Sequence, residues 1–281
     1  MMGDYKMTDL SKIKCFLLDM DGTVTIGNEL LPGAAEFLKY LKESGRDYLF
    51  MTNNSSKNSD DYVQKMRGLG IACNPIDVMT SGEATVNYLY SLKPKARVYL
   101  MGTPELEKQF LDYKFILTDE NPDFVVLGFD KTLTYEKLVI GCDLIRAGVP
   151  YIATHPDFNC PMPNDAYIPD CGAMMELIKA STGKMPKVIG KPNREIVESV
   201  FRKRCQYKPE EFAMVGDRLY TDVKTGINAG ITSILVLSGE ATMKDVNESD
   251  VKPTYIFKGV GEIYEYLKEK DGIGVSCVVN S

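Results

Sequence analysis

Short apolar runs alternate along the chain with longer segments in which apolar residues recur every three or four positions. The runs 13–18 and 48–51 are mostly apolar and end in polar residues, which predicts two buried parallel strands. Between them, segment 32–41 opens with a proline and places Phe37, Leu38 and Leu41 on one face, so it predicts a helix. This strand–helix–strand order predicts a doubly wound α/β fold whose ligands bind beyond the carboxyl ends of the strands.

The middle of the chain has an α/β pattern of its own. A polar stretch, 155–169, carries four prolines and predicts a loop. We therefore expect residues 82–183 to form an inserted α/β domain, and residues 1–81 and 184–281 to form a discontinuous core. Strands are predicted at 78–80, 97–102, 124–129, 151–154, 212–215 and 234–237, and helices at 59–69, 134–147, 172–181, 193–204 and 220–229.

Composition narrows the classes of partner and chemistry. The 281 residues are 44% hydrophobic and carry a net charge of −6, which gives no electrostatic reason to expect nucleic acid or an anionic membrane as partner. No apolar run is long enough to span a bilayer, and segment 1–14 lacks the apolar core of a signal peptide, so a cytoplasmic protein is expected. Seven cysteines without a C-x-x-C pair indicate reduced thiols. A single histidine, His155, excludes multi-histidine metal sites.

Polar fragments follow four of the predicted elements: DMDGT at 19–23, TNNS at 52–55, GKPN at 190–193 and GDRLYTD at 216–222. Each alone could be an ordinary turn or helix cap. Together they bring carboxylates, a hydroxyl and a lysine to the carboxyl ends of strands in one sheet. Carboxylate oxygens are the ligands of Mg²⁺, and a lysine beside a hydroxyl suits a phosphoryl group.

In this order, the fragments resemble the motifs of the haloacid dehalogenase superfamily of phosphatases, and DMDGTV at 19–24 is highly specific for it. The resemblance covers roughly residues 12–270. Only about thirty residues separate Asp21 from Thr52, whereas 139 positions separate Thr52 from Lys191. An α/β cap in the second gap is typical of the NagD and p-nitrophenylphosphatase-like branch.

The resemblance implies a role for each matched residue. Asp19 would attack phosphorus and become an aspartyl-phosphate, and Asp21 would act as general acid and then base. Mg²⁺ would bind the Asp19 carboxylate, the Asp21 carbonyl and Asp217. Thr52 and the Asn53 backbone amide would hold phosphate oxygens, Lys191 would neutralise charge, Asn54 would help orient the substrate, Thr23 would brace the loop and Asp222 would support the water shell of the metal.

The predicted 155–170 loop is harder to interpret. The branch usually has asparagine where this chain has His155, so this residue could alter substrate contacts, or it could be structural or exposed. Tyr167 and Met174 favour the core over a specificity role. The cysteines are expected to be buried or inert, although Cys171 could line the site.

The resulting hypothesis is a Mg²⁺-dependent phosphomonoester hydrolase acting on small organophosphates such as sugar phosphates, nucleoside monophosphates and p-nitrophenyl phosphate. The cap would close over the site and set specificity. Two alternatives stay open: a phosphotransferase or phosphomutase, and a non-catalytic sensor of a phosphorylated metabolite. Family members can dimerise through the cap, which leaves a homodimer open.

Overall fold

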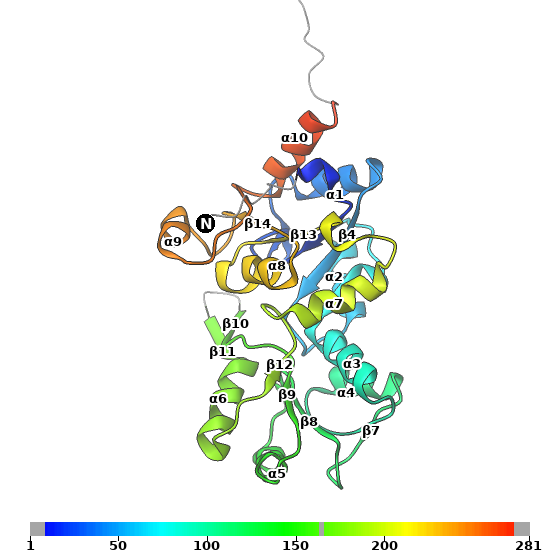
Figure 1. The fold of residues 1–281 in the computed structure, drawn as a ribbon, viewed down its shortest axis with the longest axis vertical. Coiled ribbons are helices and arrows are strands. Elements are labelled where there is room, and N and C mark those ends of the chain that lie inside the picture. The colour runs from blue at the N-terminus through cyan, green and yellow to red at the C-terminus, as the bar shows by residue number, and fades with distance from the viewer. Residues whose placement is uncertain (1–8, 163–165, 273–281) are drawn as a thin grey trace, which may run out of the picture. The chain divides into compact units, whose positions relative to one another are not determined.

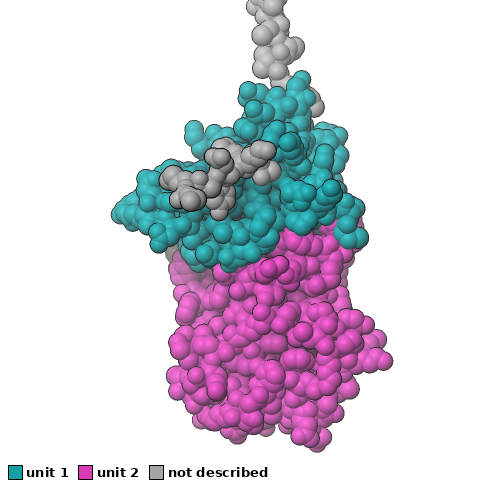
Figure 2. Space-filling model, viewed as in Figure 1, with its two compact units in different colours: residues 1–50, 205–281 teal, residues 51–204 magenta. Residues whose placement is uncertain are grey.

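The computed structural model describes residues 9–162 and 166–272. It divides into two compact units, one made of residues 1–50 and 205–281 and the other of residues 51–204 (Figure 2). The predicted core and inserted domain, with boundaries at 81/82 and 183/184, stay a prediction beside this division.

The first unit is built on parallel strands that pair in the order β15–β14–β13–β1–β4. Figure 1 labels β14, β13 and β4 of this sheet. Strands β1, β13 and β14 are buried along their whole length, as expected for apolar runs covered on both faces of a parallel sheet. Leu18 pairs with Val215 on one side and Phe50 on the other, so the residues that follow β1 and β13 emerge at neighbouring strand ends. The strands are β1 (Cys15–Leu18), β4 (Asp47–Thr52, whose last two residues belong to the second unit), β13 (Phe212–Gly216), β14 (Thr232–Val236) and β15 (Tyr255–Phe257).

The helices of this unit are α1 (Ala34–Glu43), α8 (Lys224–Ala229), α9 (Met243–Glu248) and α10 (Val260–Lys270). Helices α1 and α10 pack together, and Arg46 makes two hydrogen bonds of 2.7 and 2.8 Å to Asp271 just after α10. A helix was predicted over 220–229, but Leu219–Val223 is π-helical and α8 begins only at Lys224. The wide turn is where Asp222 lies, and π-helical turns are frequent at functional sites. The sequence prediction also missed the β2–β3 hairpin (Thr25–Ile26 and Glu29–Leu30).

The second unit has its own parallel sheet, in the order β12–β9–β8–β6–β7. Its strands are β6 (Arg97–Met101), β7 (Ile116–Leu117), β8 (Phe124–Leu127), β9 (Tyr151–Ala153) and β12 (Lys187–Val188). Strand β5 (Val78–Thr80) is not part of this sheet and directly precedes helix α3. The helices are α2 (Ser59–Gly68), α3 (Ser81–Leu92), α4 (Pro104–Asp112), α5 (Tyr135–Arg146), α6 (Cys171–Thr182) and α7 (Arg194–Lys203). Short 3₁₀ turns occupy Leu10–Lys12, Pro75–Asp77 and Pro209–Glu211.

The expected loop at 155–169 is partly wrong, because it contains an antiparallel hairpin of β10 (Asn159–Met162) and β11 (Ala166–Pro169). A two-stranded ribbon tolerates proline, since an edge position needs no backbone N–H donor. Residues 163–165 of the predicted loop lie outside the described residues. Tyr167 is 66% exposed, so its expected place in the core is wrong, whereas Met174 packs against the core between α5, α6 and the sheet.

Six of the seven cysteines lie in the described part of the chain, and the expectation of reduced thiols stays a prediction. Among the described residues no two cysteines form a disulfide. Cys15, Cys73, Cys142 and Cys171 are buried, Cys160 is half-buried and Cys205 is exposed, whereas Cys277 lies outside the described residues. Within the described part of the chain, no helix combines the length and apolar character needed to cross a membrane.

Candidate active site

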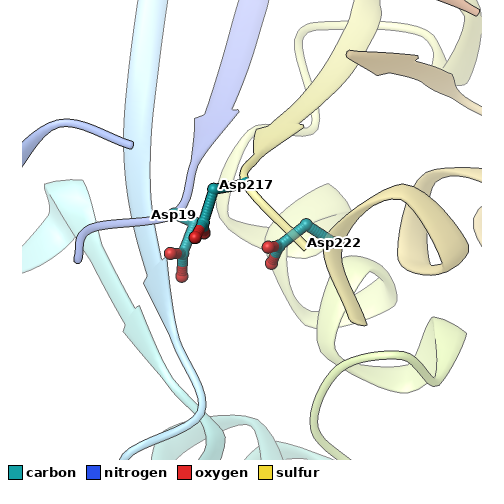
Figure 3. A group of neighbouring side chains, drawn as sticks. All are labelled: Asp19, Asp217 and Asp222. Carbon is teal, nitrogen blue, oxygen red and sulfur yellow. The ribbon is translucent and has the colours of Figure 1, made fainter. Parts of the chain in front are cut away.

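Three aspartates gather at the carboxyl ends of the central strands of the first unit. Asp19 follows β1, Asp217 follows β13, and Asp222 lies in the π-helical turn. Their carboxylates point toward a common space, and one oxygen from each lies within 4.8 Å of the others (Figure 3). Asp217 and Asp222 are buried, and Asp19 is half-buried. Ionised carboxylates this close together repel one another, and an all-oxygen donor set suits a hard divalent ion.

Glycines on two loops leave room for the Asp217 carboxylate. A Cβ atom on Gly22 would lie 2.4 Å from Asp217 Oδ2, and one on Gly239 would lie 2.0 Å from the same oxygen. Gly22 also has φ of +89°, a conformation that disfavours other residues. The Glu240 backbone N–H donates to Asp217 Oδ2 at 2.8 Å. The carboxylate is therefore held in a slot that larger side chains would close.

Asp21 and Thr23 belong to the same loop but not to the carboxylate group. Asp21 is exposed, and its Oδ1 accepts a hydrogen bond from Thr25 Oγ1 at 3.2 Å. Its side chain is thus on the accessible side of the loop, where a general acid would have to be. Thr23 is buried, and within the described residues its hydroxyl has no hydrogen-bond partner, so its predicted bracing role stays a prediction.

The residues predicted to bind phosphate and substrate after β4 belong to the second unit. The Thr52 hydroxyl accepts a hydrogen bond from the Asn54 backbone N–H at 3.2 Å. Asn54 Oδ1 in turn accepts from both the backbone N–H and the hydroxyl of Ser56, each at 2.9 Å. These local bonds fix the turn after β4, and the predicted substrate contacts of Thr52 and Asn54 stay predictions.

The structure brings Asn53 and Lys191 together, although they are far apart in the sequence. The Lys191 backbone N–H donates to Asn53 Oδ1 at 2.8 Å, and Asn53 Nδ2 donates to the Lys191 carbonyl at 3.0 Å. Asn53 Nδ2 also donates to Asp157 Oδ1 at 3.1 Å. Both Asn53 and Lys191 are buried. The predicted phosphate loop and the predicted lysine are thus parts of one arrangement.

His155 is fully buried, so the alternative of an exposed histidine is wrong. Its Nε2 lies 2.8 Å from Asp170 Oδ1, and its Nδ1 lies 2.9 Å from Thr154 Oγ1. Burial lowers the pKa of His155, but the hydrogen bond and charge of Asp170, with the charge of Asp157, outweigh it and raise the pKa. Both ring nitrogens have partners within the chain. This agrees with the structural role, one of the alternatives that the sequence left open for His155. A direct substrate contact by His155 stays a prediction.

Cys171 is fully buried, and burial raises the pKa of its thiol to about 12. A thiol in that state is a poor nucleophile, which agrees with the expected inert cysteines and gives no support to Cys171 as a site residue.

The sequence did not reveal several contacts around the three aspartates and around the Asn53–Lys191 arrangement. Glu240 donates its backbone N–H to Asp217, and its carboxylate accepts from Tyr220 Oη at 2.8 Å and pairs with Arg218 Nε at 2.8 Å. Its position just after β14 was the available signal, because polar residues at strand ends gather at one edge of the sheet. Ser55 belongs to the TNNS fragment, but its contact with Thr154 and that of Asn53 with Asp157 could not be predicted, since the partners lie about a hundred positions apart.

Comparisons with known proteins agree with this architecture. The family described as "Haloacid dehalogenase-like hydrolase" matches residues 16–116, and the family described as "HAD-hydrolase-like" matches residues 188–263. An acid sugar phosphatase of Staphylococcus aureus (strain MRSA252) is 36% identical over 261 residues, which cover 92% of this chain and 100% of the relative.

Solved structures give the same result. A 4-nitrophenylphosphatase from Thermotoga maritima has 49% sequence identity and a TM-score of 0.88, covering 92% of this chain and 98% of its own. NagD from Escherichia coli K-12 has 31% sequence identity and a TM-score of 0.83, and the match covers 89% of this chain and 98% of the NagD chain. The resemblance found in the sequence and the predicted α/β fold are confirmed. The chain belongs to the haloacid dehalogenase-like hydrolases, and within that family it is a phosphatase.

Proposed function

We propose that this phosphatase is a Mg²⁺-dependent phosphomonoester hydrolase that works through an aspartyl-phosphate on Asp19. The substrates would be small organophosphates such as sugar phosphates, nucleoside monophosphates and p-nitrophenyl phosphate. The observation that carries the proposal is the group of three aspartates within 4.8 Å, one of which directly follows the first strand of the sheet. The names of the relatives, an acid sugar phosphatase and a 4-nitrophenylphosphatase, support the substrate class.

The reaction would proceed in two displacements at phosphorus. A carboxylate oxygen of Asp19 attacks, the bond from phosphorus to the ester oxygen breaks, and Asp21 gives its proton to the departing alkoxide. A water then attacks phosphorus while Asp21 takes a proton from it. The bond from phosphorus to the Asp19 oxygen breaks, inorganic phosphate leaves and both aspartates are regenerated. The exposed side chain of Asp21 supports its exchange of protons with the leaving group and with water.

The carboxylates of Asp19 and Asp217 and the carbonyl of Asp21 would hold Mg²⁺, and Asp222 would support its water shell. The donor set fits, because it consists of oxygens alone, which are the ligands that a hard divalent cation prefers. The ion would offset the charge of the carboxylates and of the phosphoryl oxygens. The slot between Gly22 and Gly239 would keep the Asp217 carboxylate in place for this role.

Thr52, the Asn53 backbone amide and Lys191 would bind the phosphoryl oxygens. A lysine ammonium lowers the repulsion between an anionic nucleophile and an anionic phosphate, and such charge stabilisation is commonly worth two or more orders of magnitude in rate. Residues 82–183 would form the cap that excludes water and selects the substrate. These assignments rest on the family resemblance and on the location of Lys191 beside the Thr52–Asn53 loop.

Phosphate release from a panel of phosphomonoesters tests this function. The wild-type chain and Asp19→Asn are each assayed with Mg²⁺ and with EDTA. We expect Mg²⁺-dependent release that the substitution abolishes while the thermal unfolding midpoint stays close to that of the wild type. Transfer of phosphate to an added alcohol or sugar without free phosphate would instead indicate a phosphotransferase. Tight binding of esters without turnover would indicate a sensor.

A further inference from the structure

The side chain of Asn53 forms hydrogen bonds with both the backbone N–H and the backbone carbonyl of Lys191. Its Oδ1 accepts the Lys191 N–H at 2.8 Å, and its Nδ2 donates to the Lys191 carbonyl at 3.0 Å. Asn53 Nδ2 also donates to Asp157 Oδ1, with 3.1 Å between the two atoms. One side chain therefore fixes the main chain at Lys191 in the way that a neighbouring strand would.

The chemistry of these partners determines the orientation of the amide. The Lys191 N–H can only donate, so the atom facing it must be the oxygen of Asn53. The Lys191 carbonyl and the Asp157 carboxylate can only accept, so the atom facing them must be the nitrogen. A carboxylate or a methyl group at position 53 cannot meet these three requirements together.

Asn53 is itself held by buried partners. The Ser81 hydroxyl donates to the Asn53 carbonyl. Two residues further along, Ser55 Oγ accepts from the Phe129 backbone N–H at 2.9 Å and lies 3.0 Å from Thr154 Oγ1. Asn53 is 6% exposed and Ser55 is fully buried. The loop that carries Asn53 is thus anchored to the ends of β8 and β9, so it can serve as a fixed support for Lys191.

We propose that Asn53 is a positioning residue that acts through Lys191: its side-chain amide fixes the main chain of Lys191 and thereby the location of the ammonium group. This inference rests on the proposed function, which gives Lys191 its role with the phosphate. It assigns to the Asn53 side chain a task separate from the phosphate contact expected of the Asn53 backbone amide.

A double-mutant cycle tests the inference. Asn53→Ala, Lys191→Ala and the double variant are compared with the wild type for kcat and KM with p-nitrophenyl phosphate and for thermal unfolding. A displacement of about 1 Å in a catalytic group can cost on the order of 100-fold, so we expect a loss of that size in Asn53→Ala. Because Asn53 acts through Lys191, we expect the double variant to be no slower than Lys191→Ala.

The affinity for inorganic phosphate, measured by calorimetry, extends the cycle to variants too slow to assay. Asn53→Asp keeps the size of the side chain but places an oxygen against two acceptors, so it should lose as much activity as Asn53→Ala. It also serves if Asn53→Ala fails to fold. The matched control is Asn58→Asp on the same loop, where the acceptor that caps α2 is retained and no loss of activity is expected.

Several outcomes would overturn the inference. Losses that multiply in the double variant would show that Asn53 acts independently of Lys191. Full activity in Asn53→Asp would show that the amide donor is not needed, and full activity in Lys191→Ala would leave nothing to position. A wild-type chain that releases no phosphate would refute the proposed function itself, whereas an active wild type with an additive cycle would refute only the role of Asn53.

Discussion

The two units hold their candidate site residues in different ways. In the first unit, Asp19 and Asp217 follow adjacent parallel strands. The Asp217 carboxylate fits there because Gly22 and Gly239 have no side chain that would clash with it. In the second unit, Lys191 depends on the side chain of a residue from a distant loop, Asn53. The first arrangement follows from where strands end, and the second from buried polar partners.

This difference has a physical consequence. Strand ends are fixed by the backbone hydrogen bonds and the buried apolar residues of the sheet, so the carboxylates tolerate many changes nearby as long as the slot stays open. A buried polar network depends on each member, because a donor or acceptor left without its partner costs about 1–3 kcal/mol. We therefore expect substitutions to act on activity alone in the first unit and on both activity and stability in the second.

The largest effect is expected for Asp19→Asn. The amide is a poor nucleophile, so turnover should fall by on the order of 10⁴-fold or more. Removing one charge from a cluster of three carboxylates should leave the free energy of unfolding unchanged or raise it. Steady-state kinetics and chemical denaturation measure the two quantities. A large loss of stability would place Asp19 in the structural framework of the unit instead of in its chemistry.

Gly239→Ala should have the next largest effect. Its new methyl group would meet Asp217 Oδ2 at 2.0 Å and displace the carboxylate. Disturbing the support of a metal ligand typically costs 10–100-fold in affinity or activity, and we expect that loss in Mg²⁺ affinity measured by calorimetry. Gly259→Ala is the control, because a Cβ there meets no atom closer than 3.7 Å and its φ of −177° suits any residue. Equal Mg²⁺ affinities in the two variants would contradict the claim that the space beside Gly239 positions the Asp217 carboxylate.

Ser55→Ala tests the second unit. It leaves the buried Phe129 N–H without its acceptor, so the free energy of unfolding should fall by about 1–3 kcal/mol. Ser91→Ala, which removes an exposed hydroxyl bonded to the Tyr88 carbonyl, should change it by less than about 0.5 kcal/mol. Equal losses measured by urea denaturation would show that burial of the network does not set its importance.

The smallest effect is a pH dependence at His155. Its pKa is raised in the folded state, so its bond with Asp170 stabilises the fold fully below the unfolded pKa of about 6.5 and is lost as pH rises through the folded value. The stability difference between the wild type and His155→Asn should therefore shrink as pH rises above about 6.5. Denaturation at several pH values measures it, and a difference that grows with pH would contradict the assigned direction.

The sequence predicted the strand ends of the first unit better than the buried polar contacts of the second unit. Buried apolar runs located β1, β13 and β14, and the polar residues after them identified Asp19 and Asp217. The hairpin at 159–169 was missed because its prolines favour a loop and its strands are exposed. The contact between Asn53 and Lys191 was also missed, since a side chain that pairs with a distant backbone leaves no periodic pattern.

The most direct test of the account is chemical trapping of the intermediate. The chain is quenched during turnover of p-nitrophenyl phosphate and reduced with borohydride, which converts an aspartyl-phosphate to homoserine, and peptide mass spectrometry then locates the modified residue. We expect homoserine at position 19 in the wild type with Mg²⁺, and none without substrate. Modification at another residue, or turnover without any trapped acyl phosphate, would contradict the assignment of Asp19 as the nucleophile.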